Sequence, residues 1–228
     1  MNDTTTPAQR LATALTAPGS SDRLQAAMTA GTHPDPSYAE PLVARCAVEP
    51  DFAVREMLTW ALIQLPRDAV LPRVTAELLS DAPQAQAQAL HTLSKLGDDR
   101  AWPAITGSLL RSEHDEVART AWRAAVALAP AEEHAALTEL LLTQLGRGGT
   151  DVMRSLSRAL VALAERGAEV AAPLAAAQTA AATNAHPAAF AHAEATARLL
   201  ADPEASFALE PVDARRLGTA LSGSRGAH

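Results

Sequence analysis

The chain has 228 residues, of which 48% are hydrophobic and only 3% aromatic, and its formal net charge is −7. This length allows one sizeable core or a short repeat array. Alanine supplies much of the hydrophobic fraction, which suits closely packed helices and leaves little material for strands. The acidic balance argues against a dedicated nucleic-acid coat, because such proteins usually carry a basic excess.

The single cysteine, Cys46, excludes an internal disulfide framework and a cysteine-based zinc site. Residues 1–10 are polar and contain no apolar stretch, so no secretory signal is expected. The alanine-rich run 170–182 is too short for a membrane span and is interrupted by Pro173. We therefore expect a cytoplasmic protein with no membrane partner.

Two short helical patterns are predicted within residues 5–30, separated by the turn-forming run that begins at Pro18. Residues 32–37, which include Pro34 and Pro36, are predicted to form a loop. Residues 1–35 are expected to be an irregular N-terminal cap of the array that follows.

A proline marks the first helix of each predicted repeat. Pro41, Pro72 and Pro103 are 31 residues apart, and Pro173 follows after two periods of 35, with Thr138 midway. Because proline is tolerated in a helix only in its first turn, these residues are expected there. Apolar residues follow two and seven positions after each marker: Val43 and Val48, Val74 and Leu79, Ile105 and Leu110, Leu140 and Leu145, and Ala175 and Ala180.

The second helix of each predicted repeat aligns on Val54, Ala85, Val117 and Val152. The residues at offsets 0, 4, 7, 8 and 11 from these positions are almost all apolar. These offsets trace one face of an α-helix. Acidic residues often precede or open this helix, at Asp51, Asp115 and Asp151, where a carboxylate satisfies free N–H groups. The residues at offset 11 are expected to be buried in equivalent positions: Leu65, Leu96, Leu128 and Leu163.

The regular repeats cover residues 36–170, and residues 171–221 are expected to form a C-terminal cap. Within the cap, residues 190–200 are predicted to be a second helix, and residues 212–221, preceded by Pro211, a final one. Residues 222–228 are predicted to be a disordered tail. The expected organisation is a single all-α domain over residues 1–221, with about twelve or thirteen helices and no sheet.

Two stretches resemble the HEAT-repeat family of the bacterial type. The run from Leu93 to Ile105 is similar to the turn between successive HEAT repeats, and the run from Asp51 to Arg55 is similar to the family's Asp-x-x-Val-Arg opening of the second helix. The resemblance implies a right-handed α-solenoid of about six antiparallel helical hairpins. The family's Asp–Arg ladder between repeats is mostly absent, because the positions that match Arg55 are Gln86, Ala118 and Met153.

No catalytic or metal-binding constellation is found. The Gly-rich residues 146–149 are interpreted as a turn between helices, and His114 as part of a solvated helix start. HEAT-like hydroxylases use repeated His-Glu dipeptides as iron ligands, and this sequence contains none; phycobilin lyases are similar, but nothing indicates a bilin. Cys46 is expected to be partly exposed, with no His or Lys beside it to activate the thiol. We therefore expect no catalytic residue, metal or cofactor.

The remaining feature that could indicate a function is a row of residues at offsets 2, 6 and 10 of the second helices. These residues point away from the core face. In solenoids of this kind the second helices line the concave surface. Trp60 and His91 lie in this row, and Trp60 either anchors a partner or packs under the preceding loop. An ordinary solvated helix face is the alternative interpretation. The basic members of the row, opposed only by Glu56, are named the basic ridge: Lys95, Arg119, Arg123, Arg154 and Arg158.

The four arginines of the basic ridge repeat the same spacing on two successive second helices. Adjacent helices lie about 8–10 Å apart, so the guanidinium groups are expected to form a compact square. The predicted function is a non-catalytic scaffold that holds an acidic protein segment there. A HEAT-like nucleic-acid-binding protein of DNA repair or regulation is the runner-up, and a HEAT-like lyase or other enzyme is third. Salt dependence separates the first two, because nucleic-acid affinity falls steeply with salt.

Overall fold

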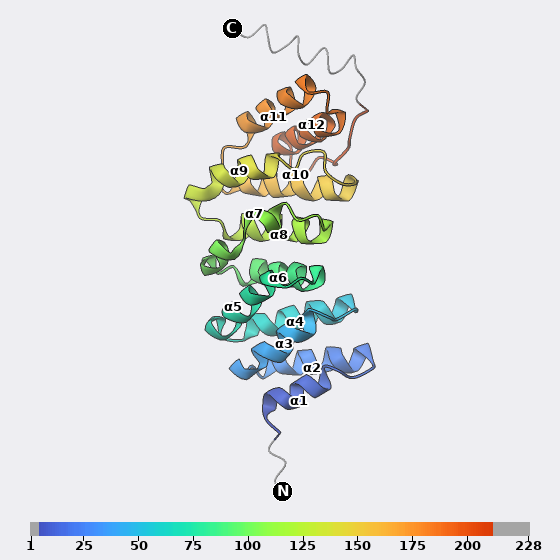
Figure 1. Cartoon of the computed structure of the whole chain (residues 1–228), viewed down its shortest axis with the longest axis vertical. Helices are drawn as coiled ribbons and strands as arrows, with labels where there is room; N and C mark the ends of the chain where they lie inside the picture. The colour runs from blue at the N-terminus through green and yellow to red at the C-terminus, as the bar shows by residue number, and fades with distance from the viewer. Residues whose placement is uncertain (1–4, 212–228) are drawn as a thin grey trace. The chain divides into compact units, whose positions relative to one another are not determined.

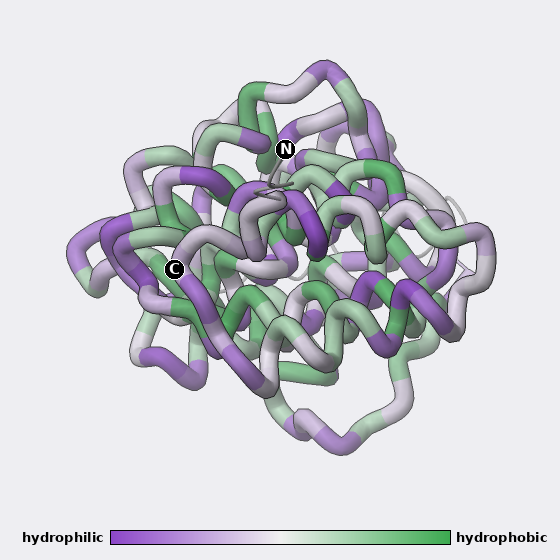
Figure 2. Tube along the Cα trace, turned by 90° about the horizontal axis from the view of Figure 1, so that it is seen from below, coloured by the Kyte–Doolittle hydropathy of each residue, from purple (hydrophilic) through white to green (hydrophobic). Residues whose placement is uncertain are grey.

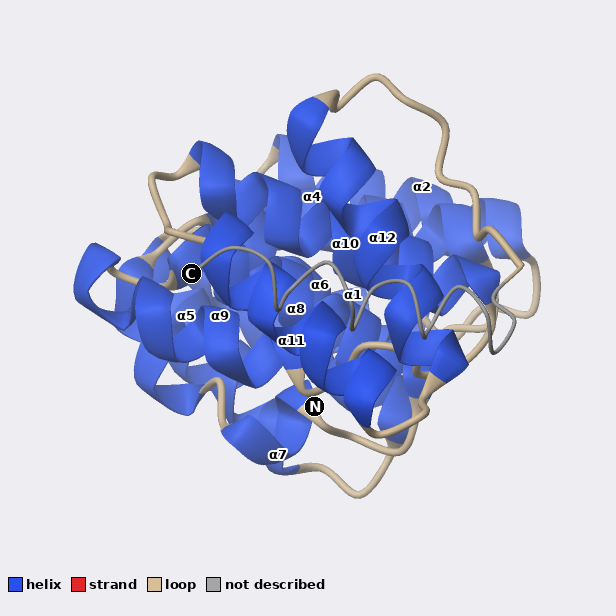
Figure 3. Ribbon diagram, turned by 90° about the horizontal axis from the view of Figure 1, so that it is seen from above, coloured by secondary structure: helices blue, strands red, loops and turns tan. Residues whose placement is uncertain are grey.

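The computed structural model describes residues 5–211, which form twelve α-helices and four short 3-10 helices and contain no strand. Figure 3 shows helices joined by loops throughout this part of the chain. The predicted all-α class is therefore confirmed for the described residues. The predicted helix at 212–221 and the predicted tail at 222–228 lie outside them.

The chain divides into two compact units. Among the described residues, the first comprises residues 5–109 and 116–128, and the second comprises residues 110–115 and 129–211. Both consist of paired helices connected by turns. Short hydrophobic and hydrophilic runs alternate along the chain, as expected for helices with one buried face (Figure 2).

The first unit has two layers of helices. In one layer α1, α3 and α5 contact each other in succession, and in the other α2, α4 and α6 do so (Figure 1). The elements are α1 (Pro7–Ala14), α2 (Ser20–Thr32), η1 (Pro36–Tyr38), α3 (Ala39–Cys46), α4 (Phe52–Gln64), α5 (Arg67–Ala76), η2 (Glu77–Leu79), α6 (Pro83–Leu96), η3 (Asp99–Ala104), α7 (Gly107–Leu110) and α8 (Asp115–Leu128). The last residue of α7, Leu110, and the first residue of α8, Asp115, are assigned to the second unit.

The second unit repeats this arrangement on a smaller scale. α9 contacts both α10 and α11, and α12 packs against α10 and α11. Its elements are η4 (Ala131–Glu133), α9 (His134–Leu142), α10 (Thr150–Glu165), α11 (Ala171–Thr183) and α12 (Pro187–Ala201). The helix predicted at residues 190–200 is therefore confirmed as α12, which begins earlier, at Pro187.

Helix starts follow local capping chemistry. The Thr6 hydroxyl accepts a hydrogen bond from the Gln9 N–H, and the Gln9 side chain accepts one from the Thr6 N–H, which closes a capping box at α1. At α4, the Asp51 carboxylate accepts a 3.1 Å hydrogen bond from the Val54 N–H. The predicted N-terminal role of the carboxylates is confirmed at Asp51, and Asp151 lies in the first turn of α10.

The predicted buried face of the second helices is confirmed. Each predicted start is the third residue of α4, α6, α8 or α10, and every residue at the five predicted offsets is at most 7% exposed. The offset-11 leucines are 3% exposed or less: Leu65, Leu96, Leu128 and Leu163. This face fixes which residues of these helices point outward.

The first helices differ from the predicted register. Pro72 lies inside α5 beyond its first turn, because that helix begins earlier, after Pro66. Val48 and Leu79 were predicted on the helical face but are 64% and 87% exposed, because α3 and α5 end before reaching them. Around Pro72 and Pro103 the core positions lie two residues before, two after and six after the proline, as in Val70, Val74 and Leu78, whereas none of these three positions is buried around Thr138 or Pro173. Ala175 and Ala180, also predicted on the helical face, are exposed.

Candidate partner-binding surface

The row opposite the buried face is accessible, as predicted, except at Ala87 of α6, which is 5% exposed. In the first unit, Lys95 and Arg123 are exposed, Arg119 and His91 are half-buried, and Trp60 is 39% exposed. These residues stand on α4, α6 and α8, whose cores hold the backbone in place. The first unit therefore presents three of the five ridge cations together with an aromatic ring.

The Trp60 ring packs against the backbone of Gly31 in α2. A Cβ atom at Gly31 would come within 2.3 Å of the ring and 3.0 Å of the Ala61 Cα, which real Cβ atoms do not tolerate. A glycine is thus required for the indole to lie flat against this helix. The Trp60 ring is held against α2 and is still 39% exposed, a combination that is typical of a rigid aromatic contact residue.

Glu56 is the only acidic group in the first unit's part of the row. Its Oε1 lies 3.2 Å from Nε2 of His91, although the contact lacks hydrogen-bond alignment. Burial lowers the pKa of His91, and the charges of Arg123 and Lys95 lower it further, against the opposing effect of Glu56. Burial and the adjacent Arg119 charge also lower the pKa of Arg123. Burial is thus the main cause of both shifts, and the charges around His91 act on its pKa in opposite directions.

The change in the His91 pKa on substitution should report the charge at position 123. We expect this pKa to lie below 6.5 in the wild type and to rise in Arg123→Glu, because a positive neighbour is replaced by a negative one. An NMR titration of the imidazole resonances measures this. Arg111→Glu serves as the control and should leave the His91 titration unchanged; a wild-type pKa above 6.5 would contradict this description.

In the second unit, Arg154 and Arg158 form one wall of a surface pocket of about 500 Å³. Val161 and Glu165 of the same helix also line it, and the segment 203–207 faces them. The Arg154 guanidinium donates to Asp151 at 3.0 Å and lies 5.9 Å from the centre of the Phe207 ring. Asp151 and Arg154 are three residues apart on one helix, and an ion pair at this spacing can be predicted from the sequence alone.

The predicted arginine square remains a prediction. Arg119 and Arg123 belong to the first compact unit, whereas Arg154 and Arg158 belong to the second. Within each unit, the two arginines are four residues apart on one helix and lie on the same side of it.

Most arginines outside the ridge hold loops together. They donate to backbone carbonyls or turn carboxylates, as Arg147 does to Ser112 O and Asp115. Further examples are Arg55 to Glu49 O and Pro50 O, Arg67 to Leu96 O, Arg100 to Asp98 and Arg166 to Ala129 O. Within residues 5–211, the Lys and Arg side chains with neither a hydrogen bond nor an ion pair are Lys95, Arg111, Arg119 and Arg158. Three of these four belong to the basic ridge.

A buried charge network around Glu49 was not predicted. Glu49 is fully buried, and its carboxylate accepts two 2.8 Å hydrogen bonds from Arg23, one of 2.7 Å from Arg45 and one of 2.9 Å from the Asp51 N–H. Burial alone would raise the Glu49 pKa, but the arginines lower it to about 2. The network joins the α1–α2 turn to the α3–α4 turn and is structural.

The second unpredicted network surrounds His192 of α12, which is fully buried. Its Nδ1 accepts a 3.0 Å hydrogen bond from the Gly146 N–H, and its Nε2 donates to the Met153 carbonyl at 2.9 Å. Ser157 Oγ lies 3.1 Å from the same Nε2 and 2.7 Å from the Thr196 hydroxyl. Because Nε2 carries the proton and Ser157 is fully buried, this is not a base–nucleophile pair.

The turn before α10 is shaped to reach His192. Gly146 has a φ of 79°, and a Cβ atom there would lie 2.7 Å from the Ala189 nitrogen. The residue must therefore be glycine for the turn to approach α12 so closely. The interpretation of residues 146–149 as an interhelical turn is confirmed.

Acid should destabilise the protein through His192. Burial lowers its pKa to about 4, whereas an unfolded histidine titrates near 6.5, so the contribution of the neutral ring is complete above about pH 6.5 and is lost toward pH 4. We expect the free energy of unfolding to fall by roughly 3 kcal/mol at most across this range. Urea titrations at stepped pH measure it. His192→Gln should be less stable at neutral pH and lack this slope; an identical slope in both proteins would reject the assignment.

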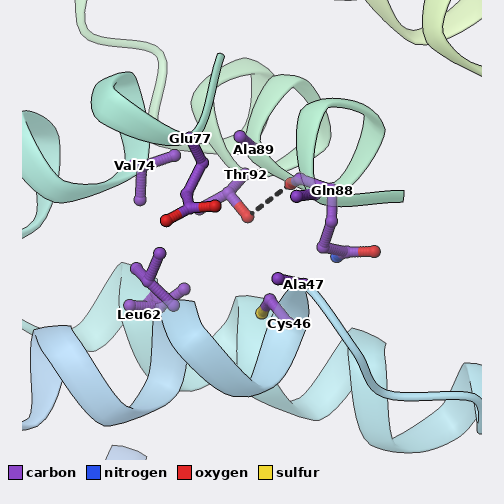
Figure 4. Close-up of a pocket in the computed structure, with 10 residues that line it drawn as sticks. Cys46, Ala47, Leu62, Val74, Glu77, Gln88, Ala89 and Thr92 are labelled. Carbon is purple, nitrogen blue, oxygen red and sulfur yellow. Dashed lines mark hydrogen bonds between the residues drawn. The ribbon is translucent and has the colours of Figure 1, made fainter. Parts of the chain in front are cut away.

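Cys46 lines a small internal cavity with Val74, Leu62 and Gln88 (Figure 4). The cavity volume is about 10 Å³, room for one water molecule at most. Cys46 is 5% exposed, so its predicted partial exposure is wrong, and burial raises its thiol pKa to about 12. The α3 helix turns this position inward, and a protonated, enclosed thiol does not act as a nucleophile.

Within the described residues, no three His, Cys, Asp or Glu side chains gather in a way that could hold a metal ion. No helix of this part of the chain combines the length and apolarity that crossing a membrane requires. A scan against protein-family models and a search of curated proteins both find no match to the chain.

Proposed function

We propose that this chain is a non-catalytic HEAT-like scaffold, a right-handed α-solenoid whose second helices bind an acidic protein segment on the basic ridge. The observation that supports this most directly is the distribution of unpaired cations. Lys95, Arg119 and Arg158 contribute no hydrogen bond or ion pair to the described fold, while other arginines hold turns together. Charges that the fold does not use are available to a partner.

The chemistry of these groups fits carboxylates. A guanidinium group presents parallel N–H donors that bind a carboxylate through two hydrogen bonds. Trp60 adds an exposed ring that is held against α2. Aromatic and arginine side chains dominate binding energy at protein interfaces. Burial and, after it, repulsion from Arg119 lower the pKa of Arg123, and an acidic segment bound here would oppose that repulsion.

A protein segment fits better than nucleic acid. The ridge is interrupted by Glu56 in the first unit, and Glu165 and Glu204 line the pocket beside Arg158 in the second. Such carboxylates would repel a continuous phosphate backbone but can be avoided by a peptide with spaced acidic residues. The formal net charge of −7 adds a general repulsion toward nucleic acid.

Affinity purification with mass spectrometry, in parallel with and without nuclease, tests the proposal. We expect the same protein partner in both samples, with acidic residues in the segment that binds. Its affinity should fall only modestly with salt. Loss of the partner after nuclease treatment, or a salt slope near −0.9 per contacted phosphate over several phosphates, would instead assign the ridge to nucleic acid.

A further inference from the structure

After α12, residues 202–205 form a turn in which the Ala205 N–H donates to the Asp202 carbonyl at 3.0 Å, and residues 206–211 continue without regular secondary structure along the second unit. Ala205, Phe207 and Leu209 are half-buried, whereas Ser206 and Ala208 between them are exposed. Alternation with a period of two is typical of an extended backbone that lies with one side on a surface. The segment therefore packs through every second side chain.

Its contacts place it on α10 and α12. The Phe207 ring meets the His192 ring edge-on, with centroids 6.0 Å apart and an interplanar angle of 87°. Arg154 lies 5.9 Å from the centre of the same Phe207 ring, a cation–π contact. The Arg198 guanidinium donates to the Ala208 carbonyl. An aromatic side chain and one backbone carbonyl thus hold the segment.

The segment is acidic and lies beside three arginines of the helices beneath it. Residues 202–210 contain Asp202, Glu204 and Glu210 and no basic residue. Arg154 and Arg158 line the pocket together with the segment, and Arg198 donates to the Ala208 carbonyl, while α10 and α12 also carry Asp151, Glu165 and Glu194. The pocket of about 500 Å³ remains open between Arg158 and the segment, so the segment covers this surface only in part.

We infer that residues 202–210 occupy in cis a docking site on α10 and α12 for extended acidic peptides with an aromatic residue flanked by small ones. A partner with this chemistry binds the second unit by displacing the segment. The inference extends the proposed function, since it assigns the ligand class at Arg154 and Arg158. Peptide binding at α10 and α12 nevertheless does not depend on the ridge residues of the first unit.

Fluorescence anisotropy with a labelled peptide of residues 201–211 tests the inference on the full-length protein. A short tether gives an effective concentration of about millimolar, so the wild-type segment should outcompete the added peptide. Phe207→Ala weakens the segment, and we expect this variant to bind the peptide at least about tenfold more tightly than the wild type. Leu209→Asp, at another half-buried position of the segment, should change peptide affinity in the same direction. Ser206→Ala, at an exposed position, should behave as the wild type.

Two further measurements establish where the peptide binds. Adding Arg158→Glu to Phe207→Ala should reduce peptide affinity at least about tenfold, as should replacing phenylalanine by alanine in the peptide itself. Circular dichroism melting verifies that each variant is folded. Equal peptide affinity of the wild type, Phe207→Ala and Leu209→Asp, or no binding to the released variants at millimolar peptide, would overturn the inference. Peptide binding without capture of any cellular partner would reject only the wider proposed function.

Discussion

Glu49→Ala is expected to lower the free energy of unfolding by about 3–5 kcal/mol, because it leaves Arg23 buried without its counter-ion. Arg23 is 6% exposed, and its guanidinium also donates to the carbonyls of Ala17 and Pro18. Those carbonyls do not neutralise its charge. Losing the carboxylate also frees Arg45 and the Asp51 N–H that opens α4. Urea denaturation followed by circular dichroism measures the loss.

Glu40→Ala is the matched control. Glu40 pairs with Arg73, but both side chains are largely exposed, at 61% and 42%. Surface pairs of this kind contribute about 0–1 kcal/mol. A loss at Glu49 no larger than the loss at Glu40 would mean that the buried network does not stabilise the first unit.

The same network should respond to strong acid. The Glu49 pKa is about 2 in the fold, below its ordinary value of 4.5. The contribution of the ionised carboxylate is complete above about pH 4.5 and is lost as the pH falls toward 2. This range lies below the one in which His192 acts, so the two networks are separable by pH.

The second helices could be predicted because their signal is local. The residues that form the buried face recur within one helix, and each of α4, α6, α8 and α10 repeats the same offsets. The outward row follows as the complement of that face. Its exposure, including that of Trp60 and Arg158, therefore needed no knowledge of tertiary structure.

The first helices show where the local signal was insufficient. The marker proline was taken as the first turn, but Pro72 lies within α5, where the helix tolerates the missing N–H. A proline therefore marks a repeat without fixing the start of its helix. Val48 and Leu79 have the right spacing, but they follow helix ends that the spacing does not reveal.

The buried networks could not be predicted because their partners are far apart in sequence. Glu49 precedes a proline in a polar turn and has the sequence appearance of an exposed acid, yet its main partner, Arg23, comes from α2. His192 depends on Gly146 and Ser157, which belong to other elements. The alternating pattern around Phe207 was readable, but it is too short to indicate what the segment covers.

The second large effect is expected from reversing two ridge charges. Arg123→Glu with Arg158→Glu should abolish partner capture while leaving the melting temperature nearly unchanged. Within the described part of the chain neither guanidinium forms an ion pair, and the only hydrogen bond of Arg123 there is a 3.3 Å contact with Thr120 in its own helix. The fold therefore loses little, whereas a bound carboxylate meets repulsion at two positions instead of attraction.

The control must change the net charge equally. Arg73→Glu with Arg111→Glu also takes the formal net charge from −7 to −11, since each replacement subtracts two charges. Both positions lie outside the basic ridge. Within residues 5–211, Arg111 is exposed and has no hydrogen bond or ion pair, like Arg158, from which it differs by lying outside the ridge.

Quantitative affinity purification of the wild type and these two double variants is the most direct test of the basic ridge. We predict that partners captured by the wild type are retained at similar levels by Arg73→Glu with Arg111→Glu. The same partners should be lost from Arg123→Glu with Arg158→Glu. Capture at the wild-type level by the ridge variant, with its melting temperature unchanged, would contradict the proposal that this surface binds the partner.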